Sequence, residues 1–292
     1  MKFEAMVIDG DNICWKNYYA NSELSYNGMK TGAIFGTIRS ILTYHKRFQP
    51  EFAMVTWTHS NSKRKEIYPQ YKATRKTEDR SDYFEQQPVV EELLSYMGVI
   101  QGKIKGYEAD DIMANVSEEL INNGFKTIII SSDKDMLQMV NNNIFVLRNE
   151  KLYTSLLVQE EFGCYPKDIP LWLAIKGDKS DNIAGVRQVG EVKLKKLFID
   201  YGVKGLEYHI MNSKIEETND NNLKRLIKDK ELIILNLKII KFNTQEINPL
   251  DNLICTNQSM DKVMTIIEKY GMHSLIKDVM EYMNENQLKE YE

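Results

Sequence analysis

Two short apolar runs that each lead to an aspartate constrain the fold of this chain more than any other feature. Residues 3–9 end at Asp9, and residues 126–131 are followed by Asp133. Runs that are apolar at nearly every position are typical of strands buried on both faces of a parallel sheet. Ligands of such sheets bind at the carboxyl ends of the strands. We therefore expect Asp9 and Asp133 to share one site.

Helical patterns separate the strand-like runs. The apolar spacing predicts helices at 32–48, about 85–97 (with Pro88 near its start) and 109–123, and further strands at 52–57 and 99–102. The alternation of strand and helix predicts an α/β fold with a central, mostly parallel sheet and helices on both faces. After residue 155 the pattern is helical, with a long helix at 223–242 and two more helical stretches after Pro249.

The length of 292 residues suits two domains. We place a boundary near residue 175, which gives an α/β domain over 1–175 and an α-helical domain over 176–292. No apolar run approaches the length of a membrane span, and the three cysteines are dispersed without a CxxC pair. We therefore expect packing cysteines, no membrane association and a cytoplasmic location.

Eight acidic residues fall into four tight groups along the chain. They are Asp9; Glu108, Asp110 and Asp111; Asp133 and Asp135; and Asp178 and Asp181. Carboxylate oxygens are the hard ligands that Mg²⁺ and Mn²⁺ prefer. Two such ions about 3.5–4 Å apart stabilise both the attacking and the leaving oxygen in phosphodiester hydrolysis. The acidic groups thus indicate two divalent metal ions that act on phosphates.

Each acidic group taken alone has a simpler explanation. An Asp-Gly pair after a strand is usually a turn, and the acids at 108–111 open a helix, where they favourably meet the helix dipole. Asp133 and Asp135 resemble a cap and first helical turn, and Asp178 and Asp181 resemble surface residues on one helical face. Four groups together, two of them at strand ends, favour metal binding. The chain has no EF-hand loop, Walker A sequence or zinc-ligand spacing.

Taken by itself, the net charge of −4 argues against nucleic acid as a partner. Subtracting the eight clustered negative charges from −4 leaves a remainder of +4. Residues 61–80 concentrate the positive charge, with seven Lys or Arg and three acids. A negative pocket beside a basic patch suits a metal-dependent nuclease, because the metals lie inside the pocket and the phosphate backbone lies alongside.

Five motifs resemble the 5′-nuclease superfamily, which includes bacteriophage 5′-exonucleases, the 5′-nuclease domain of bacterial DNA polymerase I and flap endonucleases. They are VIDGDN at 7–12, YPQYKATR at 68–75, GYEADDIMA at 106–114, SSDKDMLQMV at 131–140 and KGDKSDNIAGVRQVGEVKL at 176–194. The resemblance covers roughly residues 3–200, with a weaker helical match beyond. It implies hydrolysis of phosphodiesters near 5′ ends by a free-standing, phage-type enzyme, located in the host cytoplasm if it is phage-encoded.

The resemblance also implies roles for the acids. Those that would form or border the first metal site are Asp9, Glu108, Asp110, Asp111 and Asp133. Those that would form the second are Asp135, Asp178 and Asp181. The segment 61–97 would form a helical arch or clamp over the free 5′ strand. Lys72 and Arg75 in this segment would meet the scissile phosphate, and Tyr71 would stack on a base. From composition alone, Lys72 and Arg75 are better explained as an ordinary solvated basic face.

A second DNA contact is implied for the GVRQVG segment at 185–190. It resembles the family's helix-turn-helix that grips duplex DNA, and helix N-termini bind phosphate well. The residues implied in this contact are Gly185, Val186, Arg187, Gly190, Lys193, Lys195 and Lys196. The turn also holds a K⁺ ion in relatives, which the resemblance implies here too. The simpler alternative is a plain interhelical turn.

The chain departs from the family at one position. The family places another aspartate just after the second strand, where this chain has Thr56-Trp57-Thr58-His59. His59 or water would then complete the first metal site. We expect activity to persist, either weakened or with a Mn²⁺ preference, because imidazole suits Mn²⁺ better than Mg²⁺.

Two other functions stay open. One is a catalytically weakened or inactive protein that binds branched DNA, and the other is a PIN-type ribonuclease. Retention of eight mutually repelling acids argues against an inactive site, and PIN-type proteins usually lack the GVRQVG region. The expected partners are DNA with 5′ flaps, nicks, gaps or free 5′ ends, and RNA–DNA hybrids are compatible. We expect a monomer; a polymerase or single-strand-binding protein is a compatible partner without a motif.

Overall fold

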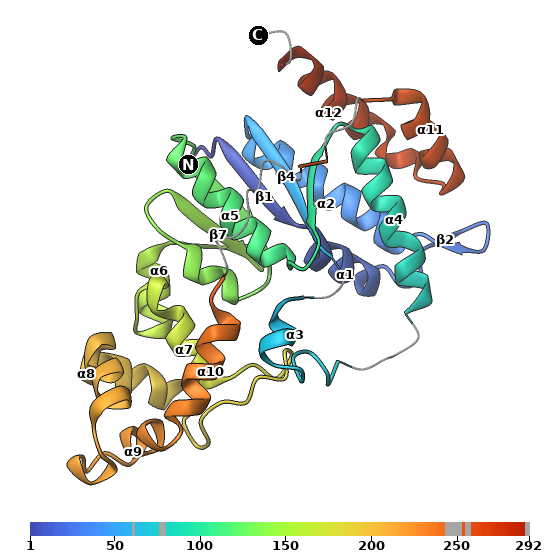
Figure 1. The fold of residues 1–292 in the computed structure, drawn as a ribbon. Coiled ribbons are helices and arrows are strands. Elements are labelled where there is room, and N and C mark those ends of the chain that lie inside the picture. The colour runs from blue at the N-terminus through green and yellow to red at the C-terminus, as the bar shows by residue number, and fades with distance from the viewer. Residues whose placement is uncertain (60–61, 76–79, 243–252, 255–257, 290–292) are drawn as a thin grey trace. The chain divides into compact units, whose positions relative to one another are not determined.

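The computed structural model describes residues 1–59, 62–75, 80–242, 253–254 and 258–289 (Figure 1). Contacts divide the chain into two compact units. The first unit comprises Met1–Ser60, Thr77–Ser131 and Thr244–Glu292, and the second comprises Asn61–Lys76 and Ser132–Asn243. This division crosses the predicted boundary near residue 175, because the C-terminal helices belong to the first unit. The prediction that a nuclease domain ends and a DNA-binding domain begins near residue 175 stays a prediction.

The first unit is built on a mostly parallel sheet. Its strands are β1 (Ala5–Asp9), β4 (Phe52–Thr58), β5 (Ile100–Ile104), β6 (Thr127–Ile130) and β9 (Leu253–Ile254). They lie in the order β6-β1-β4-β5-β9, and only β9 runs antiparallel to its neighbour. All of β1 and β6 is buried, as the apolar runs predicted.

Helices cover both faces of this sheet (Figure 1). They are α1 (Gly10–Ala20), α2 (Gly32–Phe48), α4 (Ser81–Tyr96), α5 (Ala109–Asn122), α11 (Met260–Lys269) and α12 (Ile276–Lys289). α5 packs on β1, β4, β5 and β6, whereas α1, α2 and α4 pack together on the other face. A short hairpin of β2 (Ser25–Tyr26) and β3 (Met29–Lys30) joins α1 to α2. The predicted sheet with helices on both faces is thus confirmed.

The glycine of the first motif brings α1 close to the sheet. A Cβ atom on Gly10 would lie 2.8 Å from the carbonyl oxygen of Thr56 and 2.8 Å from the ring of Trp57. Because real Cβ atoms do not approach other atoms so closely, only glycine fits between β1 and α1. The parallel pairing of β1 with β4 sets their carboxyl ends side by side, with Asp9 paired to Thr56 in the register.

The second unit is largely helical. Its elements are α3 (Arg64–Ile67), η1 (Asp135–Met139), β7 (Ile144–Arg148), β8 (Lys151–Tyr153), α6 (Ser155–Phe162), η2 (Pro166–Asp168), α7 (Ile169–Lys176), α8 (Glu191–Asn212), η3 (Ile215–Glu217), α9 (Asn221–Lys228) and α10 (Lys230–Ile240). The apolar helix α7 lies at its centre and packs on α10 and η1. α3 is attached to α10 because the buried Arg64 donates from Nε to the carbonyl oxygen of Ile239 at 2.8 Å.

Several predicted bounds were wrong. The helix predicted at 85–97 begins at Ser81, and Pro88 lies inside it rather than near its start. The helix predicted at 223–242 is two helices, because the backbone turns at Asp229 between α9 and α10. The hairpin of β7 and β8 was not predicted, since its strands are short and its turn residues, Asn149 and Glu150, lack a glycine. Pro249 lies outside the described residues.

Two cysteines can be described, and both are buried and free. Burial raises the pKa of Cys14 and of Cys164 to about 12, so both thiols are neutral at physiological pH. Among the described residues, no helix has the length and apolar character needed to cross a membrane.

Candidate active site

Asp9 ends β1 and caps α1 at the carboxyl edge of the sheet. Its Oδ1 accepts the backbone N–H of Asn12 at 3.0 Å, and its Oδ2 accepts the hydroxyl of Ser131 at 2.7 Å. Ser131 follows β6 directly, so this bond joins the ends of two neighbouring strands. The side chain is buried, with 4% of its surface exposed. A carboxylate in this position is fixed before any ligand arrives.

Two further acids cap α5 at the same edge. Glu108 is the N-cap residue, and Asp111 lies one turn into the helix. Each side chain accepts a backbone N–H of the other, the Glu108 N–H lying 3.4 Å from Asp111 Oδ2. Both are buried, whereas Asp110 between them is half-buried. The positive end of the helix dipole favours these charges. The two acids therefore do cap the helix, as the simpler explanation held, and this role does not exclude metal binding.

A further carboxylate of the first unit was not singled out in the sequence. Asp11 is the second acid of VIDGDN, and its Oδ2 accepts the backbone N–H of Thr58 at 2.7 Å. Its Oδ1 accepts the side-chain amide of Gln87 at 3.2 Å. Burial raises the pKa of Asp11, although hydrogen bonds from Thr58 partly oppose this rise. Its spacing of two from Asp9 was the available signal.

The basic segment of the second unit gathers on Asp181. Tyr71 donates its hydroxyl to Asp181 Oδ2 at 3.0 Å, and Arg75 lies 2.7 Å from Oδ1. The ammonium of Lys72 is 3.9 Å from Oδ2, and its backbone N–H donates to the Asp181 carbonyl at 3.0 Å. The sequence predicted both groups separately, and the structure brings them together within this unit.

Asp178 forms an ion pair with a different cationic side chain. Lys134, which was not predicted as a site residue, lies 3.0 Å from Asp178 Oδ2, and Ser180 donates its N–H and hydroxyl to Oδ1 at 2.7 and 2.6 Å. Burial by itself would raise the pKa of Asp178, but the Ser180 and Lys134 hydrogen bonds outweigh it and hold the pKa below its usual value. Asp178 is therefore ionised at neutral pH.

Asp133 carries the opposite shift. Burial raises the pKa of its carboxyl, and the negative charges of Asp181 and Asp178 raise it further. A hydrogen bond from the backbone N–H of Asp135, 2.9 Å from Asp133 Oδ1, and the charge of Lys72 act in the other direction. A carboxylate with this balance gains from a nearby cation.

The carboxylates suit a hard divalent cation, but they do not form a closed cage. Among the described residues, no three Asp, Glu, His or Cys side chains are grouped closely enough to hold a metal ion. Mg²⁺ usually keeps several waters and takes only one or two carboxylates, with substrate phosphates completing its shell. The donor chemistry therefore fits Mg²⁺ or Mn²⁺ in an open site.

The GVRQVG segment lies between α7 and α8. Val186 and Val189 are buried and anchor it, whereas Arg187, Lys193 and Lys196 are exposed. Lys193 donates to the carbonyl oxygen of Gln188 at 3.1 Å, and Lys195 donates to that of Glu160. Gly190 precedes α8, and Gly185 lies against the carbonyl of Lys176, where a side chain would clash. This part of the chain is two helices joined by a loop, and its helix-turn-helix character is unconfirmed.

An aromatic ledge lies on α1 and α4 of the first unit. It consists of Trp15, Tyr18, Tyr19, Tyr83 and Phe84. The ring of Trp15 is stacked on that of Tyr83, with centroids 3.5 Å apart, and Arg80 lies over Trp15 at 5.0 Å. Tyr19 and Phe84 are 56% and 60% exposed. Sequence reasoning missed this ledge because its members come from helices 60 residues apart.

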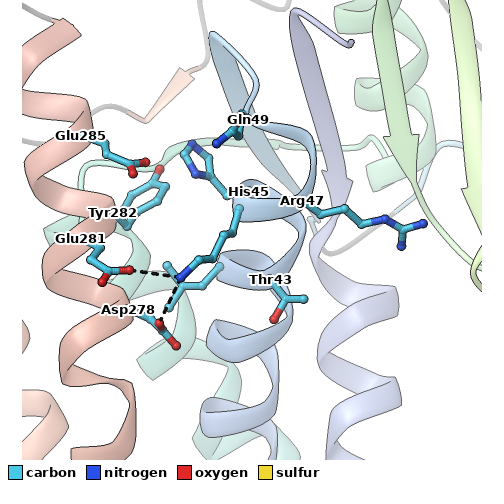
Figure 2. Close-up of a pocket in the computed structure, with 10 residues that line it drawn as sticks. Thr43, His45, Arg47, Gln49, Asp278, Glu281, Tyr282 and Glu285 are labelled. Carbon is cyan, nitrogen blue, oxygen red and sulfur yellow. Dashed lines mark hydrogen bonds and ion pairs between the residues drawn. The ribbon is translucent and has the colours of Figure 1, made fainter. Parts of the chain in front are cut away.

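One cavity of about 380 Å³ lies between α2 and α12 (Figure 2). Lys46 is one of its lining residues, and its ammonium lies 4.0 Å from Asp278 and 3.2 Å from Glu281. The ring of His45 meets that of Tyr282 edge to face at 4.7 Å. Because the end of α2 leads into the start of β4, this cavity lies at the amino edge of the sheet, away from Asp9.

The arch predicted over 61–97 is described only in part. Residues 60–61 and 76–79 lie outside the described residues, and the remainder forms α3, turns that carry Tyr71 and Lys72, and α4. His59, proposed as a substitute ligand, is described, and its backbone N–H donates to the carbonyl of Tyr107 at 3.3 Å.

Comparisons with known proteins agree on one family. The model of the 5′-3′ exonuclease N-terminal resolvase-like domain matches residues 4–163. A 5′-3′ exonuclease of Aquifex aeolicus is 31% identical over 94% of this chain and 94% of its own length. DNA polymerase I of Borreliella burgdorferi is 29% identical over 97% of this chain, which spans only 32% of that larger protein.

Solved structures share the fold. T5 5′-exonuclease with bound zinc ions covers 96% of this chain at a TM-score of 0.69 and 20% identity, and 99% of that chain is covered. The catalytic core of Rad2 in complex with a DNA substrate covers 96% of this chain at a TM-score of 0.59 and 16% identity, with 92% of that chain covered.

Proposed function

The chain belongs to the 5′-3′ exonuclease family, and from this premise we propose that it hydrolyses DNA phosphodiesters near free 5′ ends. Its substrates are DNA flaps, nicks, gaps and ends, and its cofactors are two divalent cations, Mg²⁺ or Mn²⁺. The observation that carries the proposal is the convergence of Tyr71, Lys72 and Arg75 on Asp181. A phosphate group requires cationic side chains in fixed positions, and its metal ions require nearby carboxylates. The cluster around Asp181 supplies both kinds of group.

We divide the eight acids between two metal ions. We assign the first metal ion to Asp9, Glu108, Asp110 and Asp111, bordered by Asp133, and the second to Asp135, Asp178 and Asp181. Support comes from the chain itself, because Asp133 follows Ser131 by two residues and Ser131 is bonded to Asp9. Divalent ions held by these acids would supply positive charge to the attacking and leaving oxygens of the phosphodiester.

The protein's own groups orient the DNA. Arg75 has a half-exposed side chain that is oriented by Asp181, and it binds a non-bridging phosphate oxygen. Lys72 adds charge beside it, and its backbone at φ 58° holds the turn that presents both side chains. Tyr71 is 3% exposed and bonded to Asp181, so we give it a role in holding that carboxylate rather than in stacking on a base.

Duplex DNA is assigned to the loop before α8. Exposed Arg187, Lys193 and Lys196 lie near an N-terminus whose N-cap, Gly190, has no side chain to occupy the helix N–H groups. Phosphate binding there, with a K⁺ ion at the turn, belongs to the proposal, as does a cytoplasmic location.

The test is cleavage of a 5′-labelled flap duplex in Mg²⁺, in Mn²⁺ and in EDTA. We expect short 5′ fragments in either metal, none in EDTA, and none from Asp133→Ala. Asp261→Ala, an exposed acid on α11, is the matched control and should cleave normally. Tight flap binding without cleavage in either metal would show a DNA-binding protein instead. Cleavage of RNA alone would show a ribonuclease.

A further inference from the structure

Asp11 lies where the chain lacks the usual carboxylate. The stretch Thr56–His59 has no acid, yet the carboxylate of Asp11 reaches this point from α1 and accepts the N–H of Thr58 at 2.7 Å. Thr58 is the last residue of β4. A side chain from a neighbouring element thus brings negative charge to the end of the strand.

Thr58 also connects the end of β4 to α5 through a hydrogen bond. Its Oγ1 accepts the backbone N–H of Ala109 at 3.1 Å, and Ala109 is the first residue of α5. Glu108 and Asp111 cap the same turn. The bonds therefore run from Asp11 to Thr58 and from Thr58 to the backbone of the first turn of α5, and Asp9 lies two residues before Asp11.

Asp11 is itself held from its other side. Gln87 on α4 donates to its Oδ1 at 3.2 Å and also to Glu91 at 3.3 Å, and Glu91 is paired with Lys103 at 2.8 Å. Both oxygens of Asp11 are thus engaged by protein donors, which suits an outer contact better than a direct ligand.

We propose that Asp11 is a positioning residue that compensates for the absent carboxylate by fixing the end of β4 and the first turn of α5 relative to Asp9. This inference rests on the proposed metal-dependent function. The acids of α5 then approach a divalent cation in a preset geometry, and a loosened geometry weakens its binding. Loss of an outer contact typically reduces metal affinity 10–100-fold.

The experiment measures Mn²⁺ binding by electron paramagnetic resonance and flap cleavage against metal concentration, with the melting temperature followed in metal-free buffer. We expect Asp11→Asn to weaken Mn²⁺ binding about 10-fold or more and to raise the metal needed for half-maximal cleavage in proportion. Thr58→Val removes the hydroxyl that accepts from Ala109 and also interacts with Asp11. It should weaken binding in the same way with the Asp11 carboxylate still present.

The matched control is Glu91→Gln, because Glu91 belongs to the same hydrogen-bonded chain but makes no contact with Thr58. It should lower the melting temperature and leave the Mn²⁺ affinity unchanged. A rescue variant, Asp11→Asn with Thr58→Asp, moves the carboxylate to the end of β4 and should recover most of the lost affinity.

A purely structural role for Asp11 predicts other results. Asp11→Asn and Thr58→Val would then lower the melting temperature but bind Mn²⁺ like the wild-type protein, and this outcome overturns the inference. If the wild-type protein itself neither binds Mn²⁺ nor cleaves, the proposed function fails. If the wild-type protein does both and the two variants match it, only the role of Asp11 fails.

Discussion

Residue by residue, the acids of this chain differ in ways that their spacing does not reveal. The spacing identified eight carboxylates, but not that Asp178 is paired with Lys134 while Asp133 is surrounded by like charge. Such differences depend on burial and on neighbours brought by the fold. Asp11 was missed for the same reason, because its partner Thr58 is 47 positions away.

Asp133→Asn is expected to impair flap cleavage and to stabilise the metal-free protein at neutral pH. Burial raises the pKa of Asp133, so the native state binds this proton more tightly than the unfolded chain does. The stability due to this proton is complete below the normal pKa and is lost as pH rises through the raised one. The variant should therefore melt above the wild-type protein at pH 7.5 in EDTA, with the gain shrinking at pH 4.

The measurement is calorimetry at both pH values, together with flap cleavage, which should fall at least 10–100-fold. Asp261→Asn is the control and should follow the wild-type curve. A variant that melts below the wild-type protein at pH 7.5 would show that the buried charge is already compensated by the protein.

Arg75→Ala is expected to impair cleavage without loss of stability. Half of the Arg75 side chain is exposed, and exposed ion pairs contribute about 0–1 kcal/mol to folding. Removing a preorganised phosphate contact, in contrast, typically slows turnover about 10²–10³-fold. Single-turnover cleavage measures this effect, and Lys65→Ala, an exposed cation on α3, should react at the wild-type rate. Equal cleavage rates for both variants would show that Arg75 is part of an ordinary solvated basic surface.

At the scale of elements, strands were predicted better than connections. The runs that became β1, β4 and β6 are apolar enough to be recognised without tertiary information. The break between α9 and α10 was not visible, since Asp229 is a tolerable helix residue and the turn there is set by packing of α10 on α7.

The aromatic ledge is an element-scale prediction, since it exists only because α1 and α4 are adjacent. Aromatic rings stack on unpaired bases with about 1–3 kcal/mol for each base. Phe84→Ala should therefore weaken binding of a single-stranded 5′ flap by about 5–100-fold and leave blunt-duplex binding unchanged, as measured by fluorescence anisotropy in EDTA. Leu156→Ala, with 65% exposure on α6, is the control. An equal loss for flap and blunt duplex would contradict base stacking.

Asn236 connects three segments of the second unit. Its buried amide donates to the carbonyl oxygens of Ala174 on α7 and Ala184 in the following loop, both at 2.8 Å. Asn236→Ala leaves two carbonyls without this donor, which should reduce the free energy of unfolding by about 1–3 kcal/mol. Urea unfolding measures the change, and Asn212→Ala, on the exposed face of α8, should change it little. Wild-type stability in Asn236→Ala would mean that water replaces the amide.

For the whole molecule, the order of segments along the chain is a poor guide to how it is assembled. The predicted domains at 1–175 and 176–292 followed the change from alternating strands to helices. In the structure, the last helices return to the first unit, and such a return leaves no local signal in the sequence. Ser259, for example, donates its N–H to the carbonyl of Tyr96 at 2.9 Å.

This assembly predicts that a fragment ending at residue 175 does not fold as an independent domain. α11 packs on α4 and α12 packs on α2, burying Val263, Ile267 and Val279 completely. Removing these helices exposes apolar surface of α2 and α4. Each Å² of apolar surface exposed to water costs roughly 25 cal/mol of folding free energy. We expect the fragment to show no cooperative thermal transition and to bind a hydrophobic dye, whereas the full chain melts cooperatively. The fragment 1–175 also lacks α10, on which α7 packs, so a fragment ending at residue 242 separates the two effects. That longer fragment should keep the second unit protected from proteolysis while the first unit is degraded. A cooperative transition of the fragment 1–175 near the wild-type melting temperature would instead support a domain boundary near residue 175.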